Sequence, residues 1–182
     1  MTIWQLLPER GTRFAGLAYF DEADAEDDSF DTDGTAKKWI TPPRVEVVLE
    51  PKRKAPKPLA EVSFVAAGSL VLTDRGVDVL GSFLSRFGQL LPLRLGERRL
   101  HFFNVTNLVD CIDVERSECI EGAVLEEAFR PDRIPLDAQV FKDPRTARAR
   151  IYANDSAHDE LLRLIAVNGL TGLAVEPVGI VT

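Results

Sequence analysis

Apolar residues recur at helical spacing in two stretches of the chain. The first stretch follows Thr73, and its apolar side chains stand three or four residues apart: Val77, Leu80, Phe83, Leu84 and Phe87. Thr73 is a residue type that caps helix N-termini, and Gly88 is typical of the position just after a helix. The pattern therefore predicts a helix between Thr73 and Gly88.

The second stretch covers residues 156–167. Asn154 and Asp155 before it are a strong N-cap signal, and Asn168 with Gly169 after it is typical of a helix end. We expect this helix to bury four side chains: Leu161, Leu162, Leu164 and Ile165.

Runs of β-branched and aromatic residues predict strands elsewhere. The expected strands are residues 3–7, 14–20, 44–50, 69–72, 123–129, 138–142, 150–153 and 173–178. A further hairpin over residues 89–105 turns at Gly96 and Glu97, as a type II′ turn requires. Its second strand has apolar residues on both faces, so we expect it to be central in a sheet. These elements predict an α+β fold with a mixed or mostly antiparallel sheet and two main helices.

A chain of 182 residues is long enough for one substantial core. Residues 1–58 have the weaker pattern, and they end in the basic, proline-rich stretch 51–58. We expect them to form a variable N-terminal part ahead of a core at residues 59–182, within one compact domain.

The chain carries a net charge of −7. This balance argues against a nucleic-acid partner or docking on anionic membranes, because both require a basic face. It suits a basic protein partner, since complementary fields speed association. Solubility alone is the alternative explanation.

One run concentrates the negative charge between residues 21 and 33. Its acidic residues are Asp21, Glu22, Asp24, Glu26, Asp27, Asp28, Asp31 and Asp33. With few apolar side chains to bury, the run is expected to be a loop. These eight carboxylates are the candidate partner-binding residues, where they would steer a basic partner. A loop that only adds solubility is the alternative.

The two cysteines, Cys111 and Cys119, are too few for a disulfide scaffold and too far apart for a zinc or redox motif. We expect both to be buried free thiols. The N-terminus lacks the basic start and the unbroken apolar run of a signal peptide, and no stretch approaches the length of a membrane span. The expected location is the cytoplasm.

The search for metal and cofactor motifs finds none. The only histidines are His101, in a predicted strand, and His158, whose HDELL context lacks the second histidine of a zinc-protease motif. The stretch Asp31 to Gly34 is similar to a calcium loop but has Ile40 where a glutamate is needed. No phosphate-binding or dinucleotide-binding glycine pattern appears.

Support for catalysis is equally thin. Cys111 has no cationic neighbour in sequence to activate it, and a structural thiol fits better. Asp110 and Asp113 could be an acid/base pair, but Asp113 with Ser117 also fits a turn network, which we prefer. We therefore predict no enzyme activity, no catalytic residue, no cofactor and no metal.

Three blocks of the sequence resemble immunity-protein family eleven of bacterial polymorphic toxin systems. The first is an extended segment that runs into a helix, residues 70–80. The second leads from an aromatic strand into Asn104, Val105, Asn107, Leu108, Val109, Asp110, Cys111, Ile112, Asp113, Glu115 and Ser117. The third contains a strand, a helix and a closing segment with Gly169, Leu170, Gly172, Leu173, Glu176, Pro177 and Val178.

The resemblance spans residues 69–178 and implies a protein that binds and blocks a cognate toxin. Many such toxins are basic, which an acidic partner suits. Asn104, Asp110, Asp113 and Ser117 are the motif residues, and we expect their role to be structural. Two alternatives stay open: an acidic nucleic-acid mimic that blocks a DNA-binding protein, and a small hydrolase that uses His101, Asp110 and Asp113. The sequence does not define the oligomeric state.

Overall fold

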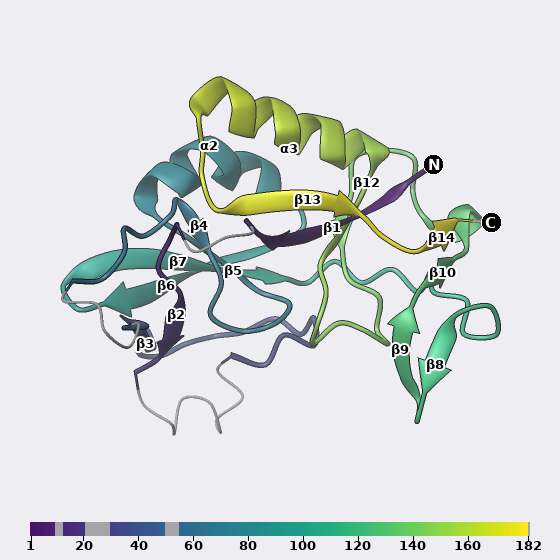
Figure 1. The fold of residues 1–182 in the computed structure, drawn as a ribbon, viewed down its shortest axis with the longest axis horizontal. Coiled ribbons are helices and arrows are strands. Elements are labelled where there is room, and N and C mark those ends of the chain that lie inside the picture. Colours follow the sequence, from purple (N-terminus) through teal and green to yellow (C-terminus); the bar gives the residue numbers. More distant parts are fainter. Residues whose placement is uncertain (10–12, 21–29, 50–54, 182) are drawn as a thin grey trace.

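The computed structural model describes residues 1–9, 13–20, 30–49 and 55–181. Within these residues, two main β-sheets and two α-helices form the body of the molecule, with both helices on the same side of the sheets (Figure 1). Most strand pairs are antiparallel, so the predicted α+β class is confirmed.

The larger sheet has six strands. In spatial order they are β2 (Leu17–Tyr19), β3 (Arg44–Val47), β6 (Gly88–Leu95), β7 (Arg98–Val105), β5 (Leu70–Leu72) and β4 (Val62–Ser63). β3 and β6 run parallel, and the other neighbours are antiparallel. β7 lies between β6 and β5, which confirms its predicted central position.

The smaller main sheet has four antiparallel strands. They are β11 (Val140–Phe141), β12 (Tyr152–Asn154), β1 (Ile3–Pro8) and β13 (Leu173–Pro177). The N-terminal strand β1 therefore lies between two strands from the C-terminal part of the chain. The predicted boundary at residue 58 stays a prediction.

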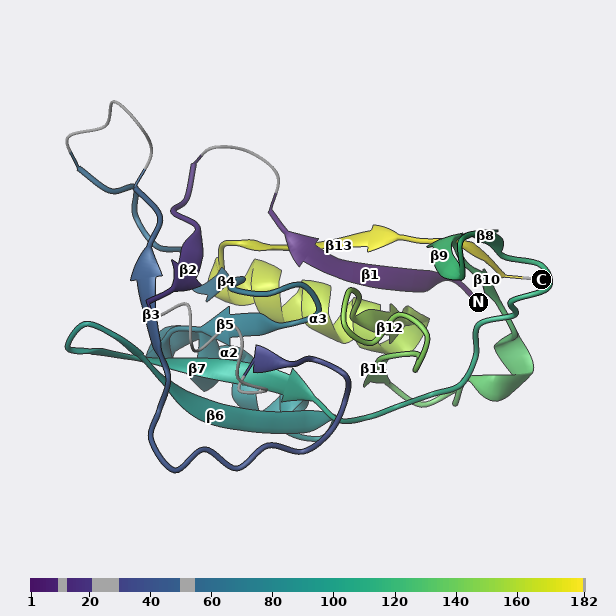
Figure 2. The ribbon, with the colours of Figure 1, turned by 90° about the horizontal axis from the view of Figure 1, so that it is seen from below.

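Two short strand pairs complete the fold. β10 (Ala128–Phe129) runs parallel to β14 (Ile180–Val181), and β8 (Glu118–Ile120) forms an antiparallel hairpin with β9 (Ala123–Glu126). A 3₁₀ turn, η2 (Pro131–Arg133), follows β10. Figure 2 shows the β8–β9 hairpin at one end of the molecule and the β6–β7 turn at the other.

Both helices begin at the predicted caps. The Thr73 side chain accepts a hydrogen bond from the amide of Gly76 at the start of α2 (Asp74–Leu84). The Asn154 side chain accepts one from Ala157 at the start of α3 (Asp155–Asn168), which ends at Gly169 in the left-handed conformation. Neither helix has the length and apolar content that crossing a bilayer requires, among the residues described.

The predicted end of the first helix at Gly88 was wrong. α2 ends at Leu84, and Gly88 begins β6. A Cβ on Gly88 would lie 2.1 Å from the carbonyl oxygen of Asn104 on β7. The glycine is therefore needed for close approach of two strands, not for a helix cap.

Two units of the fold share one topology. In each, the strands before and after a helix are parallel to each other and separated by an antiparallel strand: β7 lies between β5 and β6, and β1 between β12 and β13. The first-turn carboxylate of each helix contacts that middle strand. Asp74 lies 2.7 Å from His101, and Asp155 accepts from the Trp4 indole at 3.0 Å. The body is thus two split β-α-β units.

One apolar core lies between the helices and the inner faces of both sheets. It includes Leu6, Leu72, Leu80, Leu84, Phe103, Val105, Ala153 and Leu161. The opposite face of each sheet has its own cluster. Leu93, Leu100 and Phe102 pack with Phe30 beneath the larger sheet, and Ile3, Tyr152 and Phe141 pack with Ile112 and Phe129 beneath the smaller one.

Three side-chain predictions need correction. Leu162 is 43% exposed, because it follows the buried Leu161 by one residue and points to another side of α3. Cys119 is exposed on the β8–β9 hairpin, whereas Cys111 is buried as expected. The predicted strand 123–129 is interrupted at Glu127, which separates β9 from β10.

Candidate partner-binding site

The segment that follows β7 is held by a buried carboxylate. Asp143 is 0% exposed, and its side chain accepts hydrogen bonds from the amides of Cys111 and Ile112, each at 2.8 Å. The amide of Arg145 donates to the other carboxylate oxygen at 2.9 Å. The Asp143 carboxylate thus fixes the backbone at Cys111 and Ile112, where the chain passes from β7 toward the smaller sheet.

Asp113 and Ser117 close a turn at the end of that segment. The Ser117 hydroxyl donates to the Asp113 carbonyl at 2.6 Å and accepts from the amide of Ala128 at 2.9 Å. The Asp113 amide in turn donates to the Ala128 carbonyl at 2.8 Å. The Asp113 carboxylate accepts from the amide of Glu115 at 3.2 Å. The two motif residues therefore join the start of the β8–β9 hairpin to the chain that leaves it.

A second buried carboxylate holds the other arm of the hairpin. Glu127 directly follows β9, is 1% exposed, and forms an ion pair with Arg150. The Tyr152 hydroxyl donates to Glu127 at 2.7 Å, and burial, followed by the Glu127 charge, raises the pKa of Tyr152. Arg150 also donates to the Leu125 carbonyl at 3.0 Å. Polar contacts thus fix the hairpin at its base, where both arms begin.

The hairpin arms themselves are open to solvent. All three residues of β8 and three of the four in β9 are exposed, and they include large apolar side chains: Ile120 at 56% and Leu125 at 48%. A two-stranded hairpin gains little stability by itself in water. The hairpin thus combines a fixed base with arms that the rest of the described chain leaves largely uncovered.

The charge pattern of the hairpin is unusual. Glu118 stands directly opposite Glu126, and Glu121 occupies the tip. Like charges in cross-strand positions destabilise a sheet. Glu121 also has a φ of 50°, beside Gly122 at 84°, a conformation that costs a non-glycine residue free energy. A cationic partner would relieve the repulsion between these carboxylates.

The other two motif residues lie apart from this turn. Asn104 is buried on β7, where its amide nitrogen donates to the Thr35 carbonyl at 2.7 Å and to Gln89 at 3.2 Å. Asp110 is exposed and pairs with Arg145, whose hydrogen bond lowers the pKa of the carboxyl. Asn104 therefore ties down the 35–37 segment, and Asp110 anchors the loop before Cys111.

Only the end of the acidic run lies within the described residues. Arg148 donates to both oxygens of Asp31, at 2.9 and 2.7 Å, and this pairing lowers the pKa of Asp31. Thr35 donates to Asp33 through its amide and its hydroxyl, which lowers the pKa of Asp33. Both carboxylates therefore have partners inside the molecule.

The rest of the run lies outside the described residues: Asp21, Glu22, Asp24, Glu26, Asp27 and Asp28. Its steering role stays a prediction. The chain on either side is anchored, because Tyr19 and Phe30 pack with ring centroids 4.7 Å apart. Thr32 donates to the carbonyls of Ala67 and Arg148, and the buried amino group of Lys142 donates to the Thr32 carbonyl.

The residues weighed for catalysis belong to separate networks. His101 contacts Asp74, whereas Asp110 contacts Arg145 and Asp113 sits in the hairpin turn. The Cys111 thiol is buried, and burial raises its pKa to about 12, which suppresses thiolate formation. His158 stacks on Trp4 with centroids 3.6 Å apart. Within the described ranges, no group of three or more histidine, cysteine or acidic residues could hold a metal ion.

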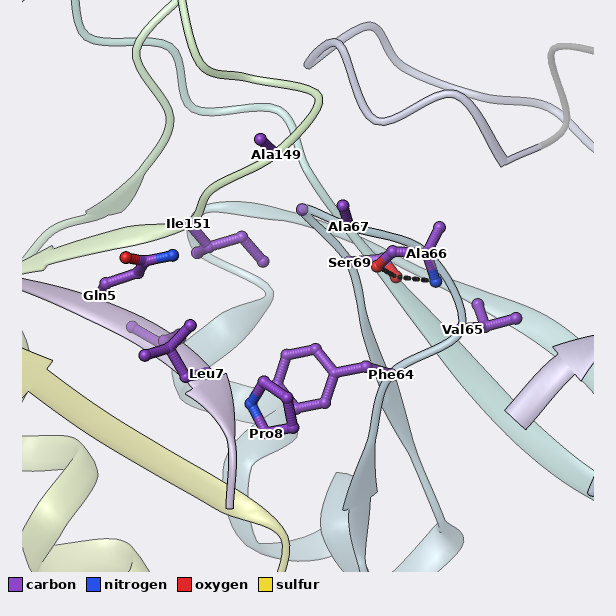
Figure 3. Close-up of a pocket in the computed structure, with 12 residues that line it drawn as sticks. Gln5, Leu7, Pro8, Phe64, Val65, Ala66, Ala67, Ser69, Ala149 and Ile151 are labelled. Carbon is purple, nitrogen blue, oxygen red and sulfur yellow. Dashed lines mark hydrogen bonds between the residues drawn. The ribbon is translucent and has the colours of Figure 1, made fainter. Parts of the chain in front are cut away.

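A cavity of about 350 Å³ opens between the two main sheets (Figure 3). Gln5, Leu7 and Pro8 of β1 line one side, and the loop from Phe64 to Ser69 lines the other. The lining is mostly apolar, and the Ser69 hydroxyl donates a hydrogen bond to the Ala66 carbonyl at 2.8 Å. No titratable side chain is among the residues that line this cavity.

Sequence reasoning missed three buried charges that shape the site: Glu127, Lys142 and Asp143. Each stands next to a short apolar strand, Glu127 before Ala128 and Lys142 with Asp143 after Phe141. The only signal in the sequence that these charges are buried is that each one borders a two-residue apolar run. The signal is weak, because exposed charges also border strands.

The three sequence blocks that resemble the immunity-protein family form strands and helices of the body and the turn at the base of the β8–β9 hairpin. The first forms β5 and the start of α2, the second spans the end of β7 and the Asp113–Ser117 turn, and the third forms β12, α3 and β13. Gly172 of the third block has a φ of 94°, and a Cβ there would lie 1.9 Å from the Val62 carbonyl oxygen. No protein-family model matches this sequence, and no curated protein matches it significantly.

Proposed function

We propose that this protein is a cytoplasmic immunity protein that neutralises a basic cognate toxin by binding it. The proposal starts from the resemblance of residues 69–178 to immunity-protein family eleven. One structural observation carries it further: the motif residues Asp113 and Ser117 fix the base of an exposed acidic hairpin. In this proposal the motif serves to present a contact surface.

The β8–β9 hairpin is the proposed contact surface. Its apolar side chains Ile120 and Leu125 would bury against the toxin, and apolar anchors surrounded by charge are typical of tight interfaces. Glu118, Glu121 and Glu126 would face basic groups around the toxin's active site, which speeds association. Because the base is fixed, little conformational entropy is lost on binding.

The protein acts in this proposal as a stoichiometric blocker without turnover. The thiol of Cys111 is buried and protonated, and the imidazole of His101 is engaged by Asp74. Both serve the fold. Substitutions that keep the fold at these positions should therefore leave protection intact.

The test asks first whether a large secreted protein is encoded beside this gene, and then uses the C-terminal domain of that protein. Co-expression should rescue growth of a bacterial host from that domain, and the two proteins should elute as an equimolar complex. His101→Gln and Cys111→Ala variants that fold should protect as well as the wild type. Absence of such a neighbour, or of a complex, would overturn the proposal. Lost protection by a folded Cys111→Ala variant that still binds would overturn the stoichiometric mechanism.

A further inference from the structure

Three arginines form a row across the larger sheet. Arg44 of β3 pairs with Arg94 of β6, and Arg94 pairs with Arg99 of β7. Paired residues on neighbouring strands point to the same face. The next pair along, Val45 with Leu95, points to the opposite face, where Val45 is buried. The row thus lies on one face of the sheet, close to the turn between β6 and β7.

All three side chains are exposed, and within the described residues none of them forms an ion pair with a carboxylate. The Arg44 guanidinium stacks on the ring of Phe20 at 3.8 Å. Like charges in directly opposite positions disfavour a sheet. An anionic group that lay against the row would relieve this repulsion.

Two hollows are lined in part by residues of the row. One, of about 230 Å³, is lined by Pro42, Pro92 and Arg94 together with Arg98 and Arg99. The other, of about 410 Å³, reaches from Arg98 and Arg99 to Thr73, Asp74 and Arg75 at the start of α2. Both hollows thus include Arg99, at the β7 end of the row, and neither is lined by Arg44.

We propose that this arginine row binds a short acid-rich polypeptide segment of another protein. Neighbouring strands lie roughly 4.8 Å apart, so the three guanidiniums span about 10 Å. Alternate side chains of an extended peptide stand roughly 7 Å apart on one face. Two carboxylates of such a segment fit within the length of the row, and arginine holds carboxylates through paired hydrogen bonds. This site is independent of the hairpin and of the proposed toxin binding.

The surroundings favour a short peptide over a nucleic acid. Glu97 at the turn, Asp74 at the start of α2 and Glu46 on β3 border the row. These carboxylates limit an anionic ligand to about the length of the row, which suits a short peptide segment better than a continuous phosphate backbone.

The test measures binding of fluorescein-labelled hexaglutamate to the full-length protein by anisotropy at low salt. The Arg94→Gln/Arg99→Gln variant should bind about tenfold or more weakly than the wild type. The control variant Arg116→Gln/Arg133→Gln removes two exposed arginines elsewhere and should bind within about twofold of the wild type. Without peptide, the Arg94→Gln/Arg99→Gln variant should melt no lower than the wild type, because it loses only repulsion.

Each of four outcomes overturns the proposal. Equal binding by the wild type and the Arg94→Gln/Arg99→Gln variant would exclude the row as the site. Equal binding of hexaglutamine would exclude a charge-based site. Tighter binding of hexathymidylate would assign the row to nucleic acid, and tighter binding of pyrophosphate would assign it to a small anion.

Discussion

The hydroxyl of Ser117 donates to the carbonyl oxygen of Asp113 across 2.6 Å, and this contact closes the base of the β8–β9 hairpin. The same hydroxyl accepts from the amide of Ala128, which lies just beyond the other arm. One side chain thus joins the two ends of an eleven-residue excursion. This pairing links a sequence motif to the exposed surface that we propose for toxin binding.

Ser117→Ala should loosen the hairpin. The Ala128 amide is left without its acceptor in a buried position, which should cost about 1–2 kcal/mol of unfolding free energy. Amide hydrogen exchange should quicken mainly across residues 114–128. Ser82→Ala, on the exposed side of α2, is the control and should change neither property. Unchanged exchange in the hairpin would contradict the bridging role of Ser117.

Glu121→Asn should stabilise the protein while weakening its binding to the toxin. Asparagine tolerates the positive φ of 50° better than glutamate does, so unfolding free energy should rise by roughly 0.5–1 kcal/mol. The lost charge should slow association with a basic toxin. Glu115→Asn removes an exposed carboxylate without relieving the backbone. If both variants gained equal stability in urea unfolding, the gain would not come from the turn.

The two thiols should differ sharply in reactivity. Cys119 is exposed on β8 and should react with Ellman's reagent within seconds to minutes, while Cys111 should react only after unfolding. Titration of the native protein should therefore show one fast equivalent. Toxin binding should then protect Cys119. Two fast equivalents would place Cys111 outside the core.

Lys142 should make stability depend on pH. Burial lowers the pKa of Lys142 from 10.5 to about 7, against the opposing charges of Asp33 and Asp31, with a smaller lowering by Lys37. Between about pH 7 and 10 the unfolded chain binds a proton that the folded chain does not. The stability of the wild type should therefore rise with pH across this window, by up to about 1.4 kcal/mol per pH unit from this group.

The matching measurement is urea unfolding at several pH values for the wild type and Lys142→Met. The stability difference between them should change in favour of the wild type as the pH rises, since methionine has no proton to lose. The exposed Lys38→Met is the control and should show no such trend. A pH-independent difference for Lys142→Met would mean that the folded lysine keeps its charge.

Local signals predicted much of this fold. Thr73 and Asn154 cap the helices as their positions indicated, and apolar residues on both faces of residues 98–105 indicated a central strand. Each of these features depends on neighbours within a few residues. Short-range pattern carries that information because capping and strand alternation are local effects.

The partners of distant strands could not be predicted in this way. The insertion of β1 between β12 and β13 depends on contacts more than 140 residues apart in sequence. The burial of Glu127 follows from the positions of Arg150 and Tyr152, which no local pattern specifies. The candidate site was not predicted for the same reason. Whether the hairpin is exposed depends on which distant segments pack against it, and no local pattern specifies those segments.

The affinity of hairpin variants for the toxin domain tests the central claim most directly. Calorimetric titration should show that Ile120→Ser weakens binding by about tenfold or more, because an exposed anchor is lost while the fixed base remains. Glu118→Gln/Glu126→Gln should weaken binding mainly at low salt and should not destabilise the free protein, since it removes a like-charge pair. Leu136→Ser alters a still more exposed leucine outside the hairpin and should bind like the wild type. Wild-type affinity in the hairpin variants would contradict this account and place the toxin contact elsewhere.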